Sequence, residues 1–299
     1  MRLVAILNRE GGTLRTTDLD WLSAHIRDSF DKAGHSVDIE IVRGGEVEAA
    51  LKRAAAAPDV DAVIAAGGDG TISAAAAALM NSDKALAILP AGTMNLFARS
   101  LKIPLSLSEA VEALAAGTRR RVDIATADGR PFIHQFSIGL HARMVMMRSR
   151  FEYGSRLGKI LASVRASLAV MARPPAMDVA LEMGETKVLA TTSGIGISNN
   201  LFGDGHLPYA DEPDRGVLGI YVLGAAGRLE IAWLMLALAA GRWKDVDTVE
   251  IHETAEAVLR IRSRRRLRAV IDGELCSVGE KVELRIHPGA LTVLVPHAE

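Results

Sequence analysis

The chain has 299 residues, of which 49% are hydrophobic and 24% are charged. This composition is typical of a globular protein with a large core and excludes disorder as its main state. The 35 Lys and Arg residues nearly balance the 36 Asp and Glu residues, and the net charge of −1 argues against nucleic-acid binding through bulk positive charge. A single cysteine, Cys276, excludes an intramolecular disulfide framework and a cysteine-rich zinc module.

At roughly 150 residues per domain, this length predicts two domains. The apolar run at the N-terminus is too short for the core of a signal peptide. The longest apolar helix candidate, Ile231–Ala240, has about half the length needed to cross a bilayer. We therefore expect a cytoplasmic protein that is still able to touch the inner membrane surface as a peripheral protein.

In the N-terminal part of the chain, short apolar runs alternate with segments that repeat apolar residues every three or four positions, as amphipathic helices do. Strands are expected at Leu3–Leu7, Val37–Val42, Ala62–Ala66 and Ala85–Leu89, and helices at Leu19–Ala33, Glu46–Ala57 and Ile72–Met80. This order predicts an α/β domain with a Rossmann-like parallel sheet and helices on both faces. Its ligand is expected beyond the carboxyl ends of the strands.

After about Asp123 the pattern changes to strand-like runs separated by turn residues. The runs lie at Phe132–Ile138, Val179–Met183, Gly194–Ser198, Gly216–Leu223, Ala257–Ile261, Ala269–Ile271 and Leu291–Val295. Two helical segments interrupt them, at Leu157–Met171 and Leu229–Ala240. The pattern predicts a second, mostly antiparallel β domain with helical insertions.

The segment Gly67-Gly68-Asp69-Gly70-Thr71 follows a buried strand and opens a helix. Its glycines allow the backbone to approach a ligand closely, and the N–H groups at the positive end of the helix favour a phosphate. The Asp69 carboxylate fits such a loop if it holds Mg²⁺ on the phosphates. The alternative is an ordinary strand-to-helix turn in which Asp69 caps the helix. The sequence contains neither a P-loop nor the standard dinucleotide-binding motif.

Two further segments place polar groups on turns. Gly92, Thr93 and Asn95 follow the next strand and form a second candidate phosphate loop, for which a loop with a capped helix is the alternative. Near the C-terminus, Asp272-Gly273-Glu274 is a strong hairpin signal. A carboxylate on such a rigid turn is also able to accept the proton of a hydroxyl group.

In this order, the GGDGT, PAGTMNLFAR and DGE segments resemble the diacylglycerol-kinase catalytic-domain family, which includes bacterial lipid kinases related to sphingosine and ceramide kinases. The resemblance continues through Phe136–Leu140, Ile197–Asn199 and Asp214–Gly216 and covers nearly the whole chain. GGDGT alone is shared with NAD kinases and phosphofructokinases, whereas the later segments are those of lipid kinases. Two residues depart from the family pattern, since Leu96 and Arg215 each stand where an Asp is common.

The resemblance implies a nucleotide-binding α/β domain of the NAD-kinase and phosphofructokinase type at residues 1–124, to which residues 287–299 return. It implies a β-sandwich domain for the lipid substrate at residues 125–286, with ATP and lipid meeting in the cleft. It also implies that Asp69 organises Mg²⁺ and the phosphates and that Glu274 is the catalytic base. The residues implied to border ATP are Asn8, Gly67, Gly68, Gly70, Thr71, Gly92, Thr93 and Asn95.

The sequence therefore predicts an ATP- and Mg²⁺-dependent lipid kinase, with diacylglycerol as the first candidate acceptor. Ceramide, a sphingoid base or another lipid is an alternative acceptor. An NAD kinase-like enzyme and a catalytically silent nucleotide- or lipid-binding regulator are alternative functions. The expected partners are the lipid substrate and, transiently, an anionic membrane surface, but not nucleic acid. A homodimer remains open.

Three segments each allow two interpretations. The arginines between Arg260 and Arg268 belong to a solvated hairpin, or they contact anionic lipid headgroups. Ile231–Ala240 is a core helix, or it forms the wall of a lipid-tail cleft or dips into a membrane. The run Met144–Met147 packs in a core, or it lines an adaptable acyl pocket.

Overall fold

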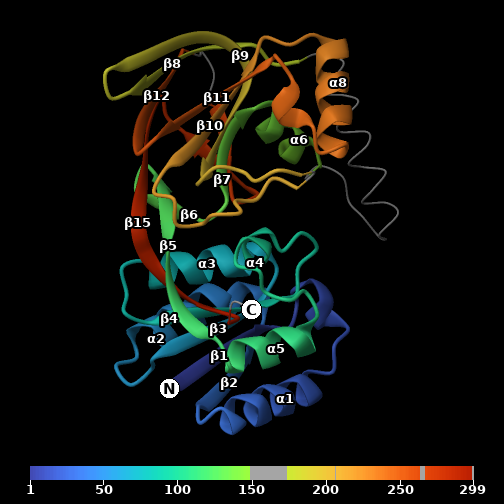
Figure 1. Ribbon diagram of the computed structural model, residues 1–299, viewed down its shortest axis with the longest axis vertical. Coiled ribbons are helices and arrows are strands. Elements are labelled where there is room, and N and C mark those ends of the chain that lie inside the picture. The colour runs from blue at the N-terminus through green and yellow to red at the C-terminus, as the bar shows by residue number, and fades with distance from the viewer. Residues whose placement is uncertain (149–173, 206, 263–266, 298–299) are drawn as a thin grey trace. The chain divides into compact units, whose positions relative to one another are not determined.

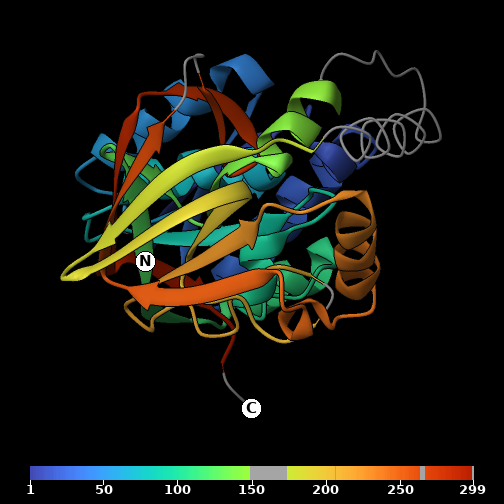
Figure 2. The same ribbon diagram turned by 90° about the horizontal axis from the view of Figure 1, so that it is seen from above.

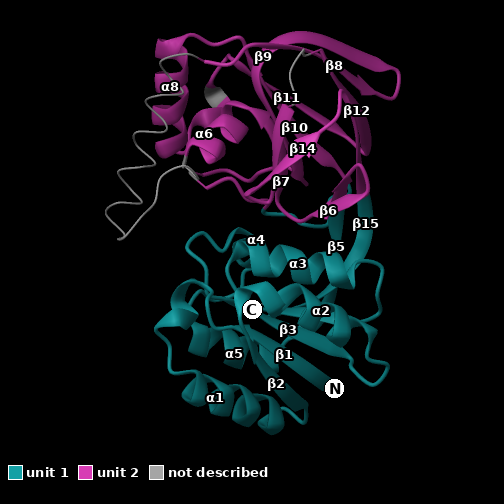
Figure 3. Ribbon diagram, turned by 180° about the vertical axis from the view of Figure 1, so that it is seen from behind, with its two compact units in different colours: residues 1–124, 211–216, 287–299 teal, residues 125–210, 217–286 magenta. Residues whose placement is uncertain are grey.

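The computed structural model describes residues 1–148, 174–205, 207–262 and 267–297. The helix expected at Leu157–Met171 and the arginines at 264–266 lie outside the described residues. The chain divides into two compact units (Figure 3). Unit 1 comprises Met1–Ile124, Asp211–Gly216 and His287–Glu299, and unit 2 comprises Ala125–Ala210 and Val217–Ile286. Residues 211–216, which the sequence interpretation assigned to the second domain, thus group with unit 1.

Unit 1 is built on a parallel sheet, as the sequence predicts (Figure 1). Its strands are β1 (Arg2–Asn8), β2 (Ser36–Val42), β3 (Ala62–Gly67) and β4 (Ala85–Pro90). Their order is β4-β3-β1-β2, and the far end of β15 (Lys281–Val295) adds a parallel partner beside β4, where Thr292 pairs with Ala85. Every residue of β3 and β4 is buried, which explains their apolar sequences.

Helices cover this sheet and supply most of the remaining core of unit 1. They are α1 (Leu19–Lys32), α2 (Val47–Ala56), α3 (Asp69–Leu79), α4 (Leu96–Ser100) and α5 (Leu107–Ala115), with 3-10 turns at Gly12–Arg15 and Gly44–Glu46. At the start of α1, the Asp18 side chain accepts hydrogen bonds from the N–H groups of Asp20 and Trp21. The same helix buries Leu22, Ile26 and Phe30 at steps of four residues.

Unit 2 is a largely antiparallel β-sandwich. Its strands are β6 (Arg130–Phe132), β7 (Gln135–Gly139), β8 (Met177–Met183), β9 (Thr186–Asn199), β10 (Leu218–Gly224), β11 (Val249–Thr254), β12 (Glu256–Arg262), β13 (Leu267–Ile271) and β14 (Glu274–Val278). The path β14-β13-β7-β9-β8-β12-β15 is antiparallel throughout, and β10 pairs with β9 and β11. The strand β5 (Thr118–Ala127) runs from unit 1 into unit 2, and β15 runs back.

Several strands of unit 2 differ from the sequence-based expectation. Strands β9 and β15 begin eight and ten residues before the runs predicted to start at Gly194 and Leu291. The run Phe132–Ile138 is not one strand, because the chain leaves the ladder between β6 and β7. Strands β11 and β14 were not expected at all. Both carry polar residues, of which Glu250, Glu253, Glu274 and Ser277 are exposed, so the apolar pattern of these strands is weak.

Two helices lie beside strands β7, β9 and β10 (Figure 1, Figure 2). They are α6 (Leu140–Arg148) and α8 (Arg228–Ala239), and a 3-10 turn at Trp243–Asp245 follows α8. Within the described part of the chain, every helix is too short or too polar to cross a bilayer.

The buried carboxylate of Asp123 joins three parts of unit 1 that are far apart in sequence. Asp123 is only 1% exposed. One oxygen accepts the N–H of Gly216 at 2.7 Å, and the other accepts the N–H of Gly289 at 2.8 Å. Its own N–H donates to the carbonyl of Pro213 at 2.9 Å. Both returning segments are therefore held by one side chain.

We predict that Asp123→Ala lowers the free energy of unfolding by about 3 kcal/mol, because it leaves the N–H groups of Gly216 and Gly289 without their acceptor. Asp123→Asn retains one acceptor oxygen and should cost less. Urea denaturation followed by circular dichroism measures both values. Asp214→Ala is the matched control, since it removes only a half-exposed ion pair with Arg120 and should cost about 1 kcal/mol or less. Equal losses for Asp123→Ala and Asp214→Ala would contradict the clamp.

Candidate nucleotide loops and an apolar cavity

Three loops meet at the carboxyl ends of β1, β3 and β4 in unit 1. The N–H of Thr13 in the first loop donates to the carbonyl of Ala91 at 2.8 Å. The N–H of Ala91 donates in turn to the carbonyl of Gly67 at 2.9 Å. Between the first and second loops, Asn8 Nδ2 donates to Thr71 Oγ1 at 3.1 Å. These contacts bring the residues predicted to border ATP together at one edge of the sheet.

Glycine is required where the two glycine-rich loops touch. A Cβ on Gly92 would lie 2.9 Å from the Cα of Gly68 and 2.8 Å from Asn95 Oδ1. A Cβ on Gly67 would lie 2.5 Å from Thr71 Oγ1. All three distances are too short for a Cβ, and at Gly92 and Gly68 the two loops pack backbone against backbone. Gly70 and Thr93 remain exposed on this edge of the sheet.

The Asp69 carboxylate connects the second loop to the third. Oδ1 accepts the N–H of Leu96 at 2.9 Å, and Oδ2 accepts the N–H of Asn95 at 3.2 Å. Asp69 is the first residue of α3, but its side chain caps the N-terminus of α4. The sequence suggested a capping role for Asp69 only at the helix that it opens. A carboxylate offers about four acceptor sites, so these two bonds leave capacity for a further ligand.

The Asn95 side chain shapes its own loop. Its backbone is left-handed, with φ of 50°, and its amide closes a ring with Gly92. Nδ2 donates to the Gly92 carbonyl at 3.1 Å, and Oδ1 accepts the Gly92 N–H at 2.8 Å. The amide that the sequence offered as a nucleotide contact thus also fixes the shape of its own loop.

These loops have the properties of a phosphate-binding cradle. Helix α3 begins at Asp69, directly after its N-cap residue Gly68. Since glycine has no side chain, Gly68 does not cap the first N–H groups of the helix. Backbone N–H groups at the start of a helix are partly positive and attract anions. Since no Cβ intervenes at Gly67, Gly68 or Gly92, a phosphate is able to approach the backbone at this edge.

The DGE turn is a hairpin in unit 2, between β13 and β14. Asp272 and Gly273 both have positive φ, 45° and 87°, as a type I′ turn requires. The Asp272 carboxylate accepts the N–H groups of Ile133, His134 and Gln135 at 2.9 to 3.0 Å. These bonds hold the segment between β6 and β7 and explain why the ladder breaks there.

Glu274, the predicted base, begins β14 and is not held in the same way. Its side chain is 68% exposed, and the Arg130 guanidinium lies 3.7 Å from its carboxylate. Two residues later, burial raises the pKa of the Cys276 thiol, as expected for a packed cysteine and not for a nucleophile. The hairpin therefore presents one solvent-accessible carboxylate on a rigid turn.

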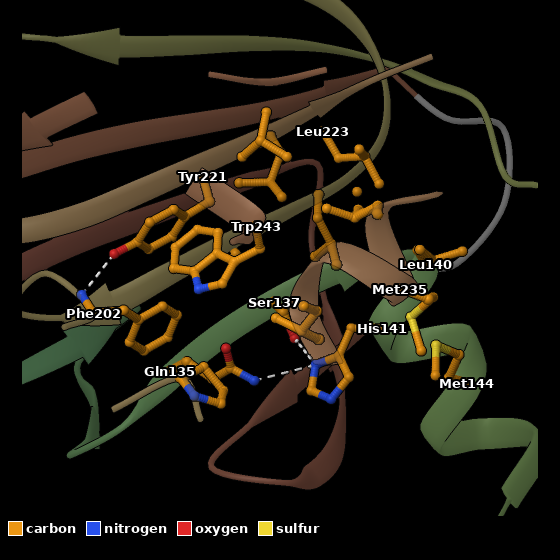
Figure 4. Close-up of a pocket in the computed structure, with 18 residues that line it drawn as sticks. Gln135, Ser137, Leu140, His141, Met144, Phe202, Tyr221, Leu223, Met235 and Trp243 are labelled. Atoms are coloured by element: carbon orange, nitrogen blue, oxygen red, sulfur yellow. Dashed lines mark hydrogen bonds between the residues drawn. The ribbon is translucent and has the colours of Figure 1, made fainter. Parts of the chain in front are cut away.

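Unit 2 also contains an apolar cavity of about 290 Å³, which the sequence interpretation located only in part (Figure 4). Met144 belongs to the Met144–Met147 run, for which the sequence allowed either a core or an acyl pocket, and it lines this cavity. Met147 packs against a neighbouring hydrophobic cluster. Leu234, Met235 and Leu238 of α8 also line the cavity, so this helix does form the wall of an apolar cleft.

Several residues of the cavity had no sequence signal. Three aromatic rings form one wall, with ring centroids 4.9 Å apart for Phe202 and Tyr221 and 5.3 Å apart for Tyr221 and Trp243. Gln135, Ser137 and His141 are neighbours in Figure 4, and Ser137 Oγ lies 2.7 Å from His141 Nδ1. For these three polar residues, the sequence offered one sign, namely that Ser137 lies within the Phe136–Leu140 segment that resembles the family.

The comparisons with known proteins agree with this architecture. The model of the "Diacylglycerol kinase catalytic domain" matches residues 2–127, and that of the "YegS C-terminal NAD kinase beta sandwich-like domain" matches residues 139–295. A diacylglycerol kinase structure from Bacillus anthracis aligns with a TM-score of 0.72 at 18% identity, covering 98% of this chain and 96% of that one. A second solved chain from the same strain aligns with a TM-score of 0.79 at 19% identity.

Relatives with assigned names are similar over most of the chain. A diacylglycerol kinase from Bacillus subtilis is 26% identical, over 88% of both chains. A protein of Pseudomonas savastanoi named "Probable lipid kinase YegS-like" is 28% identical, over 92% of this chain and 90% of its own. The chain spans 54% of the length of an uncharacterized Synechocystis protein, at 27% identity. On the two domain models together, the chain belongs to the diacylglycerol-kinase catalytic-domain family and carries the YegS-type C-terminal domain.

Proposed function

We propose that this chain is a kinase that uses ATP and Mg²⁺ to phosphorylate the hydroxyl group of a lipid, with diacylglycerol as the first acceptor to test. The observation that carries the proposal is the backbone cradle at Gly67, Gly68 and Gly92, found in a chain of this family. Phosphoryl transfer needs mainly positioning and charge neutralisation, which two glycine loops, a metal ion and one base are able to supply.

In the proposed reaction, Glu274 accepts the proton of the lipid hydroxyl. The hydroxyl oxygen forms a bond to the γ-phosphorus while the bond between that phosphorus and the leaving oxygen of ADP breaks. The exposure of the Glu274 side chain supports this role, because a general base must reach a proton on the substrate. The three hydrogen bonds of Asp272 keep the hairpin that carries it rigid.

The remaining acceptor capacity of Asp69 fits a magnesium ion shared with the phosphates. When bound, Mg²⁺ neutralises phosphate charge. Among the described residues, no group of three His, Cys, Asp or Glu side chains forms a complete metal site. Mg²⁺ is commonly held by one or two carboxylates together with substrate phosphates and water, so a single carboxylate such as that of Asp69 is a fitting ligand. In this proposal Asp69 has two tasks, since it also holds the N-terminus of α4.

The first test is incubation with labelled ATP and a panel of defined lipids, with NAD as the soluble alternative. We expect phosphorylation of a lipid and none of NAD. Glu274→Gln should lower kcat on that lipid by roughly 100-fold or more while ATP affinity is unchanged, because only the proton acceptor is lost. Glu280→Gln, on the exposed turn after β14, is the matched control and should behave as wild type. Activity of Glu274→Gln near the wild-type level would remove Glu274 from the base role.

Two substitutions at Asp69 separate its tasks. Asp69→Asn preserves one carbonyl acceptor for the loop but removes the charge, and Asp69→Ala removes both. Calorimetric titration with ATP, with and without Mg²⁺, should show that Asp69→Asn binds ATP but loses most of the Mg²⁺-dependent gain in affinity. Asp69→Ala should lose ATP affinity under both conditions. If Asp69→Asn keeps the full Mg²⁺ effect, the carboxylate is a loop clamp alone.

The exposed face of α8 suits the membrane contact expected from the sequence. Leu229, Trp233 and Leu236 recur at helical spacing and are 87%, 62% and 60% exposed. Exposed Arg228 and Arg242 flank the helix. Tryptophan favours the membrane–water interface, and arginine side chains are able to extend from there to anionic headgroups. We propose that this face rests on the surface of the bilayer that contains the substrate.

We predict that Trp233→Ser weakens binding to vesicles of phosphatidylglycerol by at least about tenfold, because one large apolar side chain no longer leaves water. Co-sedimentation with vesicles over a range of protein concentrations measures the change. Trp21→Ser, at a tryptophan of unit 1 that is 51% exposed, is the matched control and should bind as wild type. Equal binding by both variants and wild type would place the membrane contact elsewhere.

A further inference from the structure

Two hairpins of unit 2 have a turn of the same kind. Asp128-Gly129 joins β5 to β6, and Asp272-Gly273 joins β13 to β14. All four residues have positive φ, between 45° and 87°, as type I′ turns require. The strand after each turn begins with a charged residue, Arg130 in the first hairpin and Glu274 in the second. The two turns therefore present opposite charges at corresponding positions.

The aspartates anchor both turns. The Asp128 carboxylate accepts the N–H of Glu283 in β15 at 2.8 Å, and the Asp128 N–H donates to the Glu283 carbonyl at 2.8 Å. The Asp272 carboxylate holds the N–H groups of residues 133–135, which directly follow β6. Because β6 is only three residues long, these bonds also fix its first residue relative to the hairpin of the proposed base.

The two charges lie beside each other. Arg130 Nη2 is 3.7 Å from Glu274 Oε2. Burial raises the pKa of the Cys276 thiol, and Arg130 is the strongest influence in the opposite direction, so the guanidinium also lies close to the next part of β14. An exposed ion pair contributes little to stability. The contact between Arg130 and Glu274 is therefore of minor importance for the fold.

The Arg130 guanidinium is open to an anion from solvent. Its side chain is 52% exposed. A guanidinium carries five N–H donors in one plane, and none of those of Arg130 makes a hydrogen bond with another described residue. This planar and permanently charged group matches the oxygens of a phosphoryl group. Arg130 is thus able to bind a phosphoryl group beside Glu274.

The proposed reaction brings such a group to this place. A general base lies about 2.6–3.2 Å from the oxygen whose proton it removes. The phosphorus bonds to that same oxygen, so the oxygens of the transferred phosphoryl group come within a few ångströms of the Glu274 carboxylate. A guanidinium that lies 3.7 Å from this carboxylate is within reach of them.

Building on the lipid kinase proposed above, we propose that Arg130 is a second catalytic residue, which binds the phosphoryl group during its transfer and in the phosphorylated lipid. Before the reaction, Arg130 faces the Glu274 carboxylate. As the hydroxyl oxygen bonds to phosphorus and the bond from phosphorus to ADP breaks, the hydroxyl proton passes to Glu274, which becomes neutral. Arg130 then pairs with the phosphoryl oxygens instead. The guanidinium keeps all its protons throughout.

This exchange of partners makes the interaction of Arg130 strongest when the phosphoryl group is being transferred. Only interactions that are stronger in the transition state than in the bound substrate accelerate the chemical step. Because both turns are anchored, the guanidinium is in place before the reaction and needs little reorganisation. We therefore expect loss of Arg130 to affect kcat much more than substrate binding.

The first test is steady-state kinetics on the lipid that the wild type phosphorylates. Arg130→Ala should lower kcat roughly 100-fold or more, with KM for ATP and for the lipid within about twofold of the wild type. Arg130→Lys keeps the charge but loses the planar group, and should retain part of the activity. Arg285→Ala is the matched control and should behave as wild type, because it removes an exposed arginine of unit 2 that pairs with Glu256 at 2.9 Å.

Chemical rescue separates a catalytic guanidinium from a structural one. Guanidinium ion at a millimolar concentration, far below denaturing amounts, should restore part of the kcat of Arg130→Ala. It should leave the kcat of Arg285→Ala unchanged. A side chain that only supports the hairpin would show no such rescue.

Binding of the phosphorylated product gives a measurement that does not depend on turnover. The probe is phosphatidic acid with short, water-soluble acyl chains, and the corresponding diacylglycerol is the reference ligand. In calorimetric titrations, Arg130→Ala should bind phosphatidic acid roughly 10- to 100-fold more weakly, the effect of losing hydrogen bonds to a charged group, and diacylglycerol as the wild type does. Arg285→Ala should change neither affinity.

These measurements distinguish failure of this inference from failure of the proposed function. If the wild type phosphorylates a lipid and Arg130→Ala keeps its kcat, the assignment of Arg130 is wrong and the kinase stands. A loss of kcat without rescue and without weaker product binding would also overturn the assignment. If the wild type phosphorylates no lipid, the proposed function fails. Selective loss of phosphatidic acid binding in Arg130→Ala would then still support the phosphate contact, and unchanged binding would reject it.

Discussion

Carboxylates that accept backbone N–H groups from remote segments hold this protein together. Asp123 binds the N–H groups of Gly216 and Gly289. Asp69 does the same across two loops of unit 1, and Asp272 does so for the segment between β6 and β7 in unit 2. Hydrogen bonds to a charged acceptor are stronger than those between neutral groups. This type of hydrogen bond holds the returning chain segments, the glycine loops and the hairpin that carries Glu274.

The regular part of the fold follows directly from the sequence. Strands β1, β3 and β4 of unit 1 are short and apolar, and α1 and α2 carry a clear periodicity, so these elements are visible without tertiary information. β11 and β14 were missed because their exposed faces dilute the apolar pattern. The break between β6 and β7 depends on Asp272, about 140 positions away, and no local pattern contains that information.

In the candidate site, too, contiguous motifs were predictable from the sequence, whereas contacts between distant residues were not. GGDGT and the DGE turn were recognisable because each is a contiguous motif with its own backbone geometry. The loop contacts of Asp69 and Asn95 were not, since the partner of Asp69 lies in another loop and that of Asn95 is the backbone of its own loop. The cavity is harder still to predict, because β7, β9, β10, α6 and α8 each contribute only a few side chains.

The clamp at Asp123 has a consequence for the order in which the protein is made. The chain passes between the two units several times, and the end of β15 takes its place beside β4 only after every strand of unit 2 has been synthesised. The parallel sheet of unit 1 therefore cannot be completed on the ribosome while unit 2 is still emerging. Its edge at β4 therefore stays unpaired on one side for roughly two thirds of the period of translation, and an unpaired apolar strand edge is a site at which other chains are able to add.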